Sequence, residues 1–246
     1  MNLMNSENYI LIADSHLEKS REAAFFEMLE RIRLYHPAGV IFLGDIFELW
    51  VALDGYESDI HFRFLQWCKE AKKQFEVGFI VGNHEFFLPY NHADAFTWID
   101  EEEYSLDSAG IRVLHGDQLD RGDIGYRILR KLFRNPLTRF LLKITGHSIG
   151  PKAADHVRLS LKSANQRQRQ QHKLRLPMHY LKKYSENAAK LNLKKIFAGH
   201  FHQHEKLDFP DGVPVEILPA WEAAGEIALL KPDLQSECAP WQKLLK

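Results

Sequence analysis

Five short apolar runs recur along the chain, and each of them stops at polar residues. They cover residues 9–13, 40–43, 78–81, 111–114 and 195–198. Runs of this length that are rich in β-branched and aromatic residues are typical of strands covered on both faces. Apolar residues at helical spacing lie between the first three runs, and they predict helices over residues 18–35 and 62–75. Strands that alternate with helices in this way predict parallel βαβ units.

The helical spacing also predicts which side chains face the core. We expect Phe25, Met28, Leu29 and Ile32 there in the first helix, and Phe62, Leu65, Trp67 and Cys68 in the second. Pro37 should end the first helix. Beyond Gly110 the strands come closer together, with two more expected over residues 213–218 and 226–230. The pattern therefore predicts an α/β protein in which a second sheet packs on the first.

Residues 119–191 interrupt this rhythm. They contain almost no strand-like run but three helical ones, over residues 126–133, 137–144 and 156–172. We therefore predict a helical cap over residues 119–191, inserted between core segments 1–118 and 192–246. The middle run is apolar with cations on one side, which indicates either ordinary helix packing or contact with lipid.

Length and composition are those of a globular α/β domain, with 246 residues of which 45% are hydrophobic. No apolar stretch reaches the 18 residues that a membrane-spanning helix needs. The first eight residues lack the cationic start and apolar core of a secretory signal, so we expect none. Cys68 and Cys238 are far apart and outside any metal or redox spacing, which favours free thiols in a reducing cytoplasm.

Charge is distributed unevenly along the chain. Residues 1–120 carry 9 basic and 22 acidic side chains, residues 121–200 carry 19 and 3, and residues 201–246 carry 4 and 8. A segment with a net charge of +16 implies an anionic partner, which could be phosphate groups, nucleic acid or an anionic membrane surface. The alternative is a solvated basic face that keeps the protein soluble.

Every one of the five apolar runs ends in Asp, Asn or His. These residues are Asp14 and His16, then Asp45, then Asn83 and His84, then His115 and Asp117, and finally His200 and His202. Ligands bind at the carboxyl ends of the strands in open α/β sheets. Singly, each of these residues would more often be a surface or core residue, but imidazole and carboxylate together are ligands of divalent metals. We therefore predict a metal site in which Asp45 bridges two ions that clamp a phosphoryl group.

The motifs Asp-x-His, Gly-Asp, Gly-Asn-His-Glu, His-Gly-Asp and Gly-His-x-His, in this order, resemble the signature of the calcineurin-like metallophosphoesterases. The resemblance implies a four-layer αββα sandwich of two sheets flanked by helices. It also implies two ion positions, one held by Asp14, His16, Asp45 and His202, and one held by Asp45, Asn83, His115 and His200. Asn83 and His84 would be catalytic, with His84 stabilising charge on the phosphate or protonating the leaving oxygen.

Within this superfamily the chain is most similar to the bacterial UDP-2,3-diacylglucosamine pyrophosphatases of lipid A synthesis. Residues 12–17, 43–50, 115–119, 123–126 and 220–225 carry that similarity. It implies that metal-activated water attacks the pyrophosphate of this nucleotide-sugar lipid and releases UMP and diacylglucosamine 1-phosphate. The expected ions are Mn²⁺, with Fe²⁺ and Zn²⁺ as alternatives.

The same similarity implies that Asp123, Tyr126 and Arg158 bind substrate and that the cap receives the acyl chains. The basic cap would then rest on an anionic membrane, giving a cytoplasmic protein that is peripheral to the inner membrane. We infer no obligate protein partner.

Two motifs depart from that family's pattern. His84 and Glu85 stand where the family has Arg and Asp, and Gln203 and His204 stand where it has Arg and Pro. A paralogue acting on another phosphodiester or pyrophosphate is therefore an open alternative. A nuclease or a cyclic-nucleotide phosphodiesterase of the same superfamily is another, although the apolar cap and the lack of base-stacking aromatics argue against nucleic acid. A non-catalytic scaffold is the third, and the complete ligand set argues against it.

Overall fold

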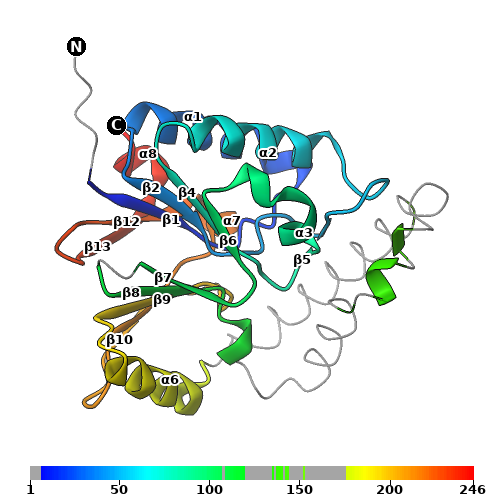
Figure 1. The fold of residues 1–246 in the computed structure, drawn as a ribbon. Helices are drawn as coiled ribbons and strands as arrows, with labels where there is room; N and C mark the ends of the chain where they lie inside the picture. The colour runs from blue at the N-terminus through cyan, green and yellow to red at the C-terminus, as the bar shows by residue number, and fades with distance from the viewer. Residues whose placement is uncertain are drawn as a thin grey trace.

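The computed structural model describes residues 7–106, 109–119, 135, 137–140, 142–143, 152 and 176–246. Two sheets lie face to face, with helices on the outer side of each (Figure 1). The helices α1 and α2 cover the first sheet, and the helix α6 covers the second (Figure 1). This arrangement confirms the predicted four-layer αββα sandwich.

The first sheet has six strands in the order β13-β12-β1-β2-β4-β6. Its four parallel strands are β1 (Tyr9–Ile12), β2 (Gly39–Phe42), β4 (Glu76–Ile80) and β6 (Trp98–Asp100). On the other side of β1, β12 (Glu226–Leu230) and β13 (Ser236–Pro240) pair antiparallel. All four residues of β2 are buried, as expected for a central strand covered on both faces.

The second sheet has five strands in the order β10-β11-β9-β8-β7. Its parallel centre consists of β11 (Val215–Ile217), β9 (Lys195–Ala198) and β8 (Ile111–Leu114). The edges are the antiparallel strands β10 (Glu205–Leu207) and β7 (Glu103–Leu106). A separate parallel pair is formed by β3 (Trp50–Val51) and β5 (Glu85–Phe86).

Two helices run between the strands of the first sheet, as predicted. The first is α1 (Glu22–Tyr35), preceded by the 3-10 turn Lys19–Arg21; it ends at His36, which is left-handed and donates its backbone N–H to Ile32 O, directly before Pro37. The second, α2 (Asp59–Ala71), begins three residues earlier than predicted because Ser58 and His61 form a capping box. Phe62 lies outside the buried stripe that includes Phe64 and Leu65, and it is 52% exposed, so its predicted core position was wrong.

The remaining helices are short, except one. They are α3 (Leu88–His92), the 3-10 turns Ala93–Ala95 and Asp117–Leu119, α6 (Met178–Lys190), α7 (Trp221–Ala224) and α8 (Trp241–Leu244). The helix α6 falls within the range predicted for the cap, and its buried Leu181 and Ala188 pack on the second sheet.

Apolar residues pack on both faces of the first sheet. Phe25, Met28 and Leu29 of α1 pack on the outer face of the first sheet. Leu11, Ile41, Val113 and Phe197 are among the residues that fill the space between the sheets.

Cys68 and Cys238 are both free, which confirms the prediction made from their spacing.

Most of the predicted cap lies outside the described residues. Leu142 is described, and it packs against a cluster beside β3 and β5 while its carbonyl accepts a hydrogen bond from the hydroxyl of Tyr56 at 3.2 Å. Asp123, Tyr126 and Arg158 lie outside the described part of the chain.

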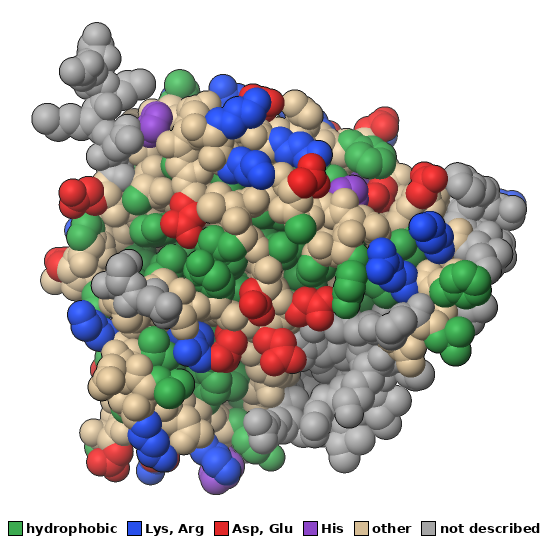
Figure 2. Space-filling view, in the orientation of Figure 1, with side chains coloured by type: hydrophobic (Ala, Val, Ile, Leu, Met, Phe, Trp, Pro, Cys, Tyr) green, Lys and Arg blue, Asp and Glu red, His purple; other side chains and the backbone are tan. Residues whose placement is uncertain are grey.

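The described surface mixes charges of both signs. On the face drawn in Figure 2, Lys and Arg side chains are interspersed with Asp and Glu side chains, and apolar side chains show between them. Among the described residues, no helix is both long and apolar enough to cross a bilayer.

Candidate metal centre

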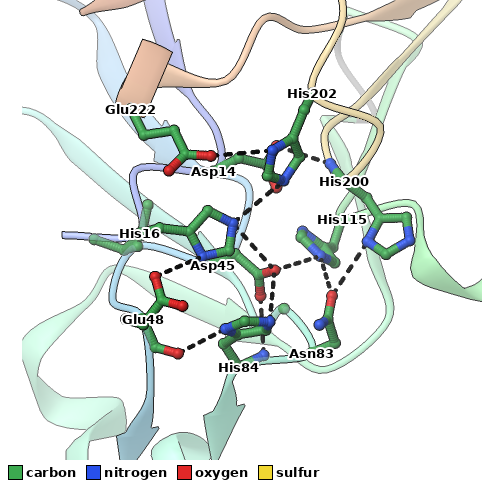
Figure 3. A network of polar contacts seen from close by, with 12 residues as sticks. Asp14, His16, Asp45, Glu48, Asn83, His84, His115, His200, His202 and Glu222 are labelled. Atoms are coloured by element: carbon green, nitrogen blue, oxygen red, sulfur yellow. Dashed lines mark hydrogen bonds and ion pairs between the residues drawn. The ribbon is translucent and has the colours of Figure 1, made fainter. Parts of the chain in front are cut away.

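The predicted ligands lie together at the carboxyl ends of five strands (Figure 3). The strands β1, β2 and β4 of the first sheet lead to Asp14, His16, Asp45, Asn83 and His84. The strands β8 and β9 of the second sheet lead to His115, His200 and His202. Both sheets therefore contribute to one cluster, which is how residues far apart in the sequence meet.

Glycines next to the ligands allow the strand ends to approach closely. A Cβ atom on Gly44, whose φ is +80°, would lie 2.6 Å from the Cα atom of Gly82. A Cβ atom on Gly82 would overlap the carboxylate of Asp45. Any larger residue at these two positions would push the loops after β2 and β4 apart.

The ligand loops hold an unusual amount of left-handed backbone. Positive φ angles occur at Asp14 (51°), His16 (37°), Asp45 (53°), His200 (70°) and His202 (51°). A non-glycine residue in this conformation costs about 1 kcal/mol or more, and such residues cluster where function requires a particular side-chain direction. Five of the seven predicted metal ligands carry this strain.

The first group of ligands comprises Asp14, His16 and His202, whose ligand atoms lie within 4.8 Å of one another. His202 Nε2 is 3.5 Å from Asp14 Oδ1 and 3.2 Å from His16 Nε2. Asp45 Oδ2 lies 3.8 Å from His16 Nε2.

The second group comprises Asp45, His115 and His200, which meet the same 4.8 Å limit. Asn83 Oδ1 is 2.9 Å from His115 Nε2 and 3.2 Å from His200 Nδ1, so the amide oxygen belongs to this group. His115 Nε2 is also 3.5 Å from Asp45 Oδ2. Asp45 thus lies between the two groups, as a bridging carboxylate must.

Backbone contacts fix the ligands in these positions. His115 Nδ1 hydrogen-bonds to Leu43 O at 2.7 Å, which turns its Nε2 toward the cluster. The carboxylate of Glu85 accepts backbone N–H bonds from Asp45 (2.9 Å), Ile46 (2.7 Å) and Gly82 (2.7 Å). Glu85 therefore clamps the loop after β2 to the loop after β4. Burial and the charge of Asp45 raise the pKa of Glu85 to about 7.

His84 lies beside the two ligand groups, and it also offers a ligand atom within 4.8 Å of those of His16 and Glu48. Its Nδ1 lies 2.6 Å from Glu48 O and its backbone N–H donates to Asp45 Oδ1 at 2.9 Å. An Nδ1–H donated to the carbonyl leaves Nε2 facing the centre, 3.8 Å from Asp45 Oδ2.

The protonation of the cluster reflects its concentration of acidic groups. Burial opposes charge on all of these groups, but His84, His115 and His16 hold the pKa of Asp45 well below its ordinary range. Against the same burial, Asp45 raises the pKa of His115 to about 10, and Asp14 with Glu222 raises the pKa of His202 to about 9. Burial and the neighbouring His115 lower the pKa of His200. A strongly negative potential of this kind favours cations.

The residues present fit a pair of divalent cations. Asp14 Oδ1 is buried and accepts no hydrogen bond from any described residue. In the described part of the chain, no Lys or Arg is paired with the carboxylate of Asp14 or Asp45. The donor set of carboxylate, amide and imidazole groups is one that Mn²⁺, Fe²⁺ and Zn²⁺ accept.

Three neighbours of this centre were not predicted from the sequence. Glu48 Oε2 is 3.9 Å from His16 Nδ1, Glu222 Oε1 is 3.1 Å from His202 Nδ1, and Arg21 Nη1 is 3.4 Å from Glu222 Oε2. Glu48 and Glu222 lie inside sequence blocks that carried the family resemblance, so those blocks held the signal. Arg21 lies in no motif.

Comparison with known proteins agrees with the family that the sequence motifs predicted. The calcineurin-like phosphoesterase family model matches residues 8–204, which include every predicted metal ligand. A UDP-2,3-diacylglucosamine hydrolase of Pseudomonas entomophila (strain L48) is 29% identical over 167 residues, covering 63% of this chain and 66% of that protein, slightly less than two thirds of its length. One of Shewanella sp. (strain MR-7) is 26% identical over 235 residues, covering 91% and 94%. Among solved structures, vacuolar protein sorting 29 from Cryptosporidium parvum has a TM-score of 0.43 and 12% identity, with 96% and 97% covered.

Proposed function

The chain belongs to the calcineurin-like phosphoesterase family, and we propose that it is a dinuclear-metal hydrolase of UDP-2,3-diacylglucosamine. Its products would be UMP and diacylglucosamine 1-phosphate. The observation that carries the hydrolase proposal is the meeting of two ligand groups at Asp45, since a bridging carboxylate is what a two-metal phosphoesterase requires. The substrate rests on the names of the relatives and on the sequence blocks shared with that family.

Asp14, His16, Asp45 and His202 would hold one ion, and Asp45, Asn83, His115 and His200 the other. Two bound ions supply positive charge that polarises the phosphoryl group and lowers the pKa of water. The protein supplies the fixed geometry. Glu85 and the hydrogen bond that His115 Nδ1–H donates to Leu43 O keep the metal ligands in place, and the strained loops keep them aimed at one point.

His84 would move the proton. The Glu48 carbonyl holds Nδ1–H, so Nε2 is the atom that faces the phosphate and can protonate the leaving oxygen. Because His84 is 3% exposed, bulk water does not compete for this nitrogen. The leaving group in the proposed reaction is a phosphate oxygen of the pyrophosphate, and a proton on it lowers the barrier to departure.

The remaining parts of the prediction belong to this proposal. Mn²⁺ would be the metal, and Asp123, Tyr126 and Arg158 would contact substrate. The part of the predicted segment 119–191 that precedes α6 would form the cap, since α6 packs on the second sheet. The net charge of +16 over residues 121–200 would favour a phosphate-rich substrate and an anionic membrane surface, giving a peripheral protein on the cytoplasmic side.

A substrate panel tests the proposal. Metal-stripped protein with added Mn²⁺ is incubated with UDP-2,3-diacylglucosamine, a plain UDP-sugar, a bis-aryl phosphate and a cyclic nucleotide, and UMP or the matching product is quantified. We expect the highest kcat/KM with UDP-2,3-diacylglucosamine, and no turnover with excess chelator. Equal or faster turnover of another member would contradict the substrate assignment.

One observation favours a second candidate, a phosphodiesterase or pyrophosphatase for another substrate. His84 stands where the diacylglucosamine family has Arg, and it is buried and held by Glu48 O. Imidazole can transfer a proton at neutral pH, whereas a guanidinium cannot. Faster turnover of the bis-aryl phosphate or the cyclic nucleotide in the panel would support this second candidate.

A further inference from the structure

Two buried carboxylates lie behind the histidines of one ion position. Glu222 Oε1 is 3.1 Å from His202 Nδ1, and Glu48 Oε2 is 3.9 Å from His16 Nδ1 (Figure 3). In both rings the other nitrogen, Nε2, faces the cluster, and the two Nε2 atoms are 3.2 Å apart. At His202 the carboxylate is within hydrogen-bond distance of Nδ1, so it fixes the tautomer that leaves Nε2 free to bind metal and makes that nitrogen more basic. Glu48 is too far from His16 Nδ1 for a hydrogen bond and acts on that ring through its negative charge.

Arg21 holds Glu222 in this position. Its Nη1 donates to Glu222 O at 2.9 Å and lies 3.4 Å from Glu222 Oε2, while its Nη2 donates to His16 O at 2.9 Å. The guanidinium thus joins the start of α7 to the loop after β1. Glu222 is 7% exposed, so its charge is not dispersed by water.

The backbone around Glu222 is anchored independently. The preceding residue, Trp221, is buried against Phe25 and donates its ring N–H to Met28 Sδ at 3.0 Å. The backbone N–H groups of Trp221 and Glu222 donate to Ala13 O at 3.0 Å and Asp14 O at 3.3 Å. Because Asp14 is itself a predicted ligand, Glu222 is fixed relative to the centre by main-chain and side-chain contacts.

At the other ion position, the histidine Nδ1 atoms have uncharged partners. His115 Nδ1 hydrogen-bonds to Leu43 O, a neutral carbonyl, and His200 directs Nδ1 to Asn83 Oδ1. Asp117 acts on both histidines through its charge, but the partner of His115 Nδ1 is uncharged.

We infer that Glu222 is a positioning residue for His202, and that with Glu48 it makes the position of Asp14, His16 and His202 the tighter of the two for a divalent cation. This inference rests on the dinuclear centre of the proposed function. It adds that Arg21, Glu48 and Glu222 set the order in which the two ions bind.

The test measures Mn²⁺ binding without substrate. Metal-stripped full-length protein is titrated by calorimetry as wild type, as Glu222→Gln, and as Glu237→Gln, a control that removes an exposed carboxylate of β13. We expect Glu222→Gln to weaken the tighter of two binding constants by about 10–100-fold and to leave the other unchanged, with Glu237→Gln like wild type. Two unchanged constants, or two constants that weaken together, would overturn the inference.

Two backgrounds separate a specific effect from general loosening of the fold. Asn83→Ala should leave only the position of Asp14, His16 and His202, and adding Glu222→Gln there must weaken the single remaining ion. Asp14→Asn should leave only the other position, and Glu222→Gln must have no effect there. If Glu222→Gln does not fold, Arg21→Gln, at a residue whose side chain is 29% exposed, should weaken the same ion to a smaller degree. An unchanged constant in Arg21→Gln would then overturn the inference.

Hydrolysis by the wild-type protein is scored separately. An inactive wild type in which Glu222→Gln still weakens one ion would refute the proposed function and leave the inference standing. An active wild type whose Mn²⁺ constants do not respond to Glu222→Gln would refute the inference alone.

Discussion

Among the described residues, the metal centre and a second cluster around Glu216 both combine histidine with a buried carboxylate, and they differ in how the negative charge is balanced. At the metal centre, no described Lys or Arg pairs with the carboxylate of Asp14 or Asp45. In the other cluster, Glu216 is 2.9 Å from Lys195 Nζ and 3.6 Å from Lys206 Nζ, and it also contacts His204 at 3.2 Å.

In the second cluster, neighbouring side chains of the same chain neutralise the charge of Glu216. Ser236 Oγ and Cys238 Sγ also donate to the carboxylate of Glu216. Although burial would raise the pKa of Glu216, the hydrogen bonds from Ser236 and Lys195 lower it. Glu216 lies in β11 of the second sheet, and its partners include Ser236 and Cys238 of β13 in the first sheet, so the cluster ties the two sheets together.

The difference teaches that residue types alone do not make a metal site. His204, Glu216 and Cys238 offer ligand atoms within 4.8 Å of one another, as the metal centre does. At Glu216, however, two lysines already supply the cation from within the chain, and a divalent ion would have to displace or repel them. At Asp45 that charge must come from outside.

The largest expected effect comes from removing the bridging charge. Asp45→Asn keeps the size of the side chain but cannot bridge two ions with full charge, so Mn²⁺ content should fall from two ions per chain to one or none, and hydrolysis should be lost. Glu216→Gln, the matching change in the other cluster, should retain both ions. Metal content is measured by atomic emission after gel filtration. Full Mn²⁺ content in Asp45→Asn would refute the bridging role.

The two clusters should also respond differently to loss of a histidine that holds no ion. His84→Ala removes the proton donor, so turnover should fall by about 10²–10⁴-fold while Mn²⁺ content stays at two. His204→Ala, which removes a 37% exposed side chain of the Glu216 cluster, should leave turnover close to wild type. Equal rates in the two variants would show that His84 has no catalytic role.

Stability should depend on the second cluster instead. Lys195→Met leaves the buried charge of Glu216 without its closest cation, and the free energy of unfolding in urea should fall by about 2–3 kcal/mol. Mn²⁺ content should not change. Lys182→Met, which breaks an exposed pair with Glu186, should cost less than about 1 kcal/mol. Combining Lys195→Met with Glu216→Gln should restore most of the free energy of unfolding. That result would show that the unpaired charge of Glu216 causes the loss in Lys195→Met.

The last expected effect concerns the pH dependence of Mn²⁺ binding and is specific to the metal centre. The pKa values of about 10 for His115 and about 9 for His202 mean that both rings are protonated at pH 7 in the ion-free protein. An ion binds only the neutral ring, so Mn²⁺ affinity should rise by about tenfold per pH unit for each proton released between pH 6.5 and 8. Glu216→Gln should show the same slope. An affinity independent of pH would contradict these protonation states.

The same pKa values set the sign of a stability change in the ion-free protein. Because they lie above the ordinary value of 6.5, the stabilisation from protonated His115 and His202 is present at pH 6.5 and is lost as pH rises through 9 to 10. The urea midpoint measured in chelator should therefore be lower at pH 10 than at pH 7.

The sequence predicted those parts of the fold that follow from local periodicity. The strands β9 and β12 and the core face of α1 were expected where they lie, because a buried strand or an amphipathic helix has a readable pattern. Phe62 was placed wrongly because its three-residue spacing to Leu65 also fits a helical face, whereas the stripe that is buried in α2 runs through Phe64 and Leu65 and leaves Phe62 outside it. The strand β13 was missed, since a five-residue edge strand that contains Ser, Glu and Pro lacks an apolar signature.

For the site, the ligand types were predictable because each follows a strand. The left-handed backbone at Asp14 and the contact between Arg21 and Glu222 were not predictable, although Glu222 itself lies in a block that carried the resemblance. They depend on how the loops after β1 and β9 pack against α7, which no local pattern encodes.

The most direct test of the account is an anomalous-scattering experiment on crystals grown with Mn²⁺. We expect two peaks roughly 3.5–4 Å apart, with the carboxylate of Asp45 between them and none at Glu216. A map with no peak beside Asp45, or with a peak at Glu216 instead, would contradict the account.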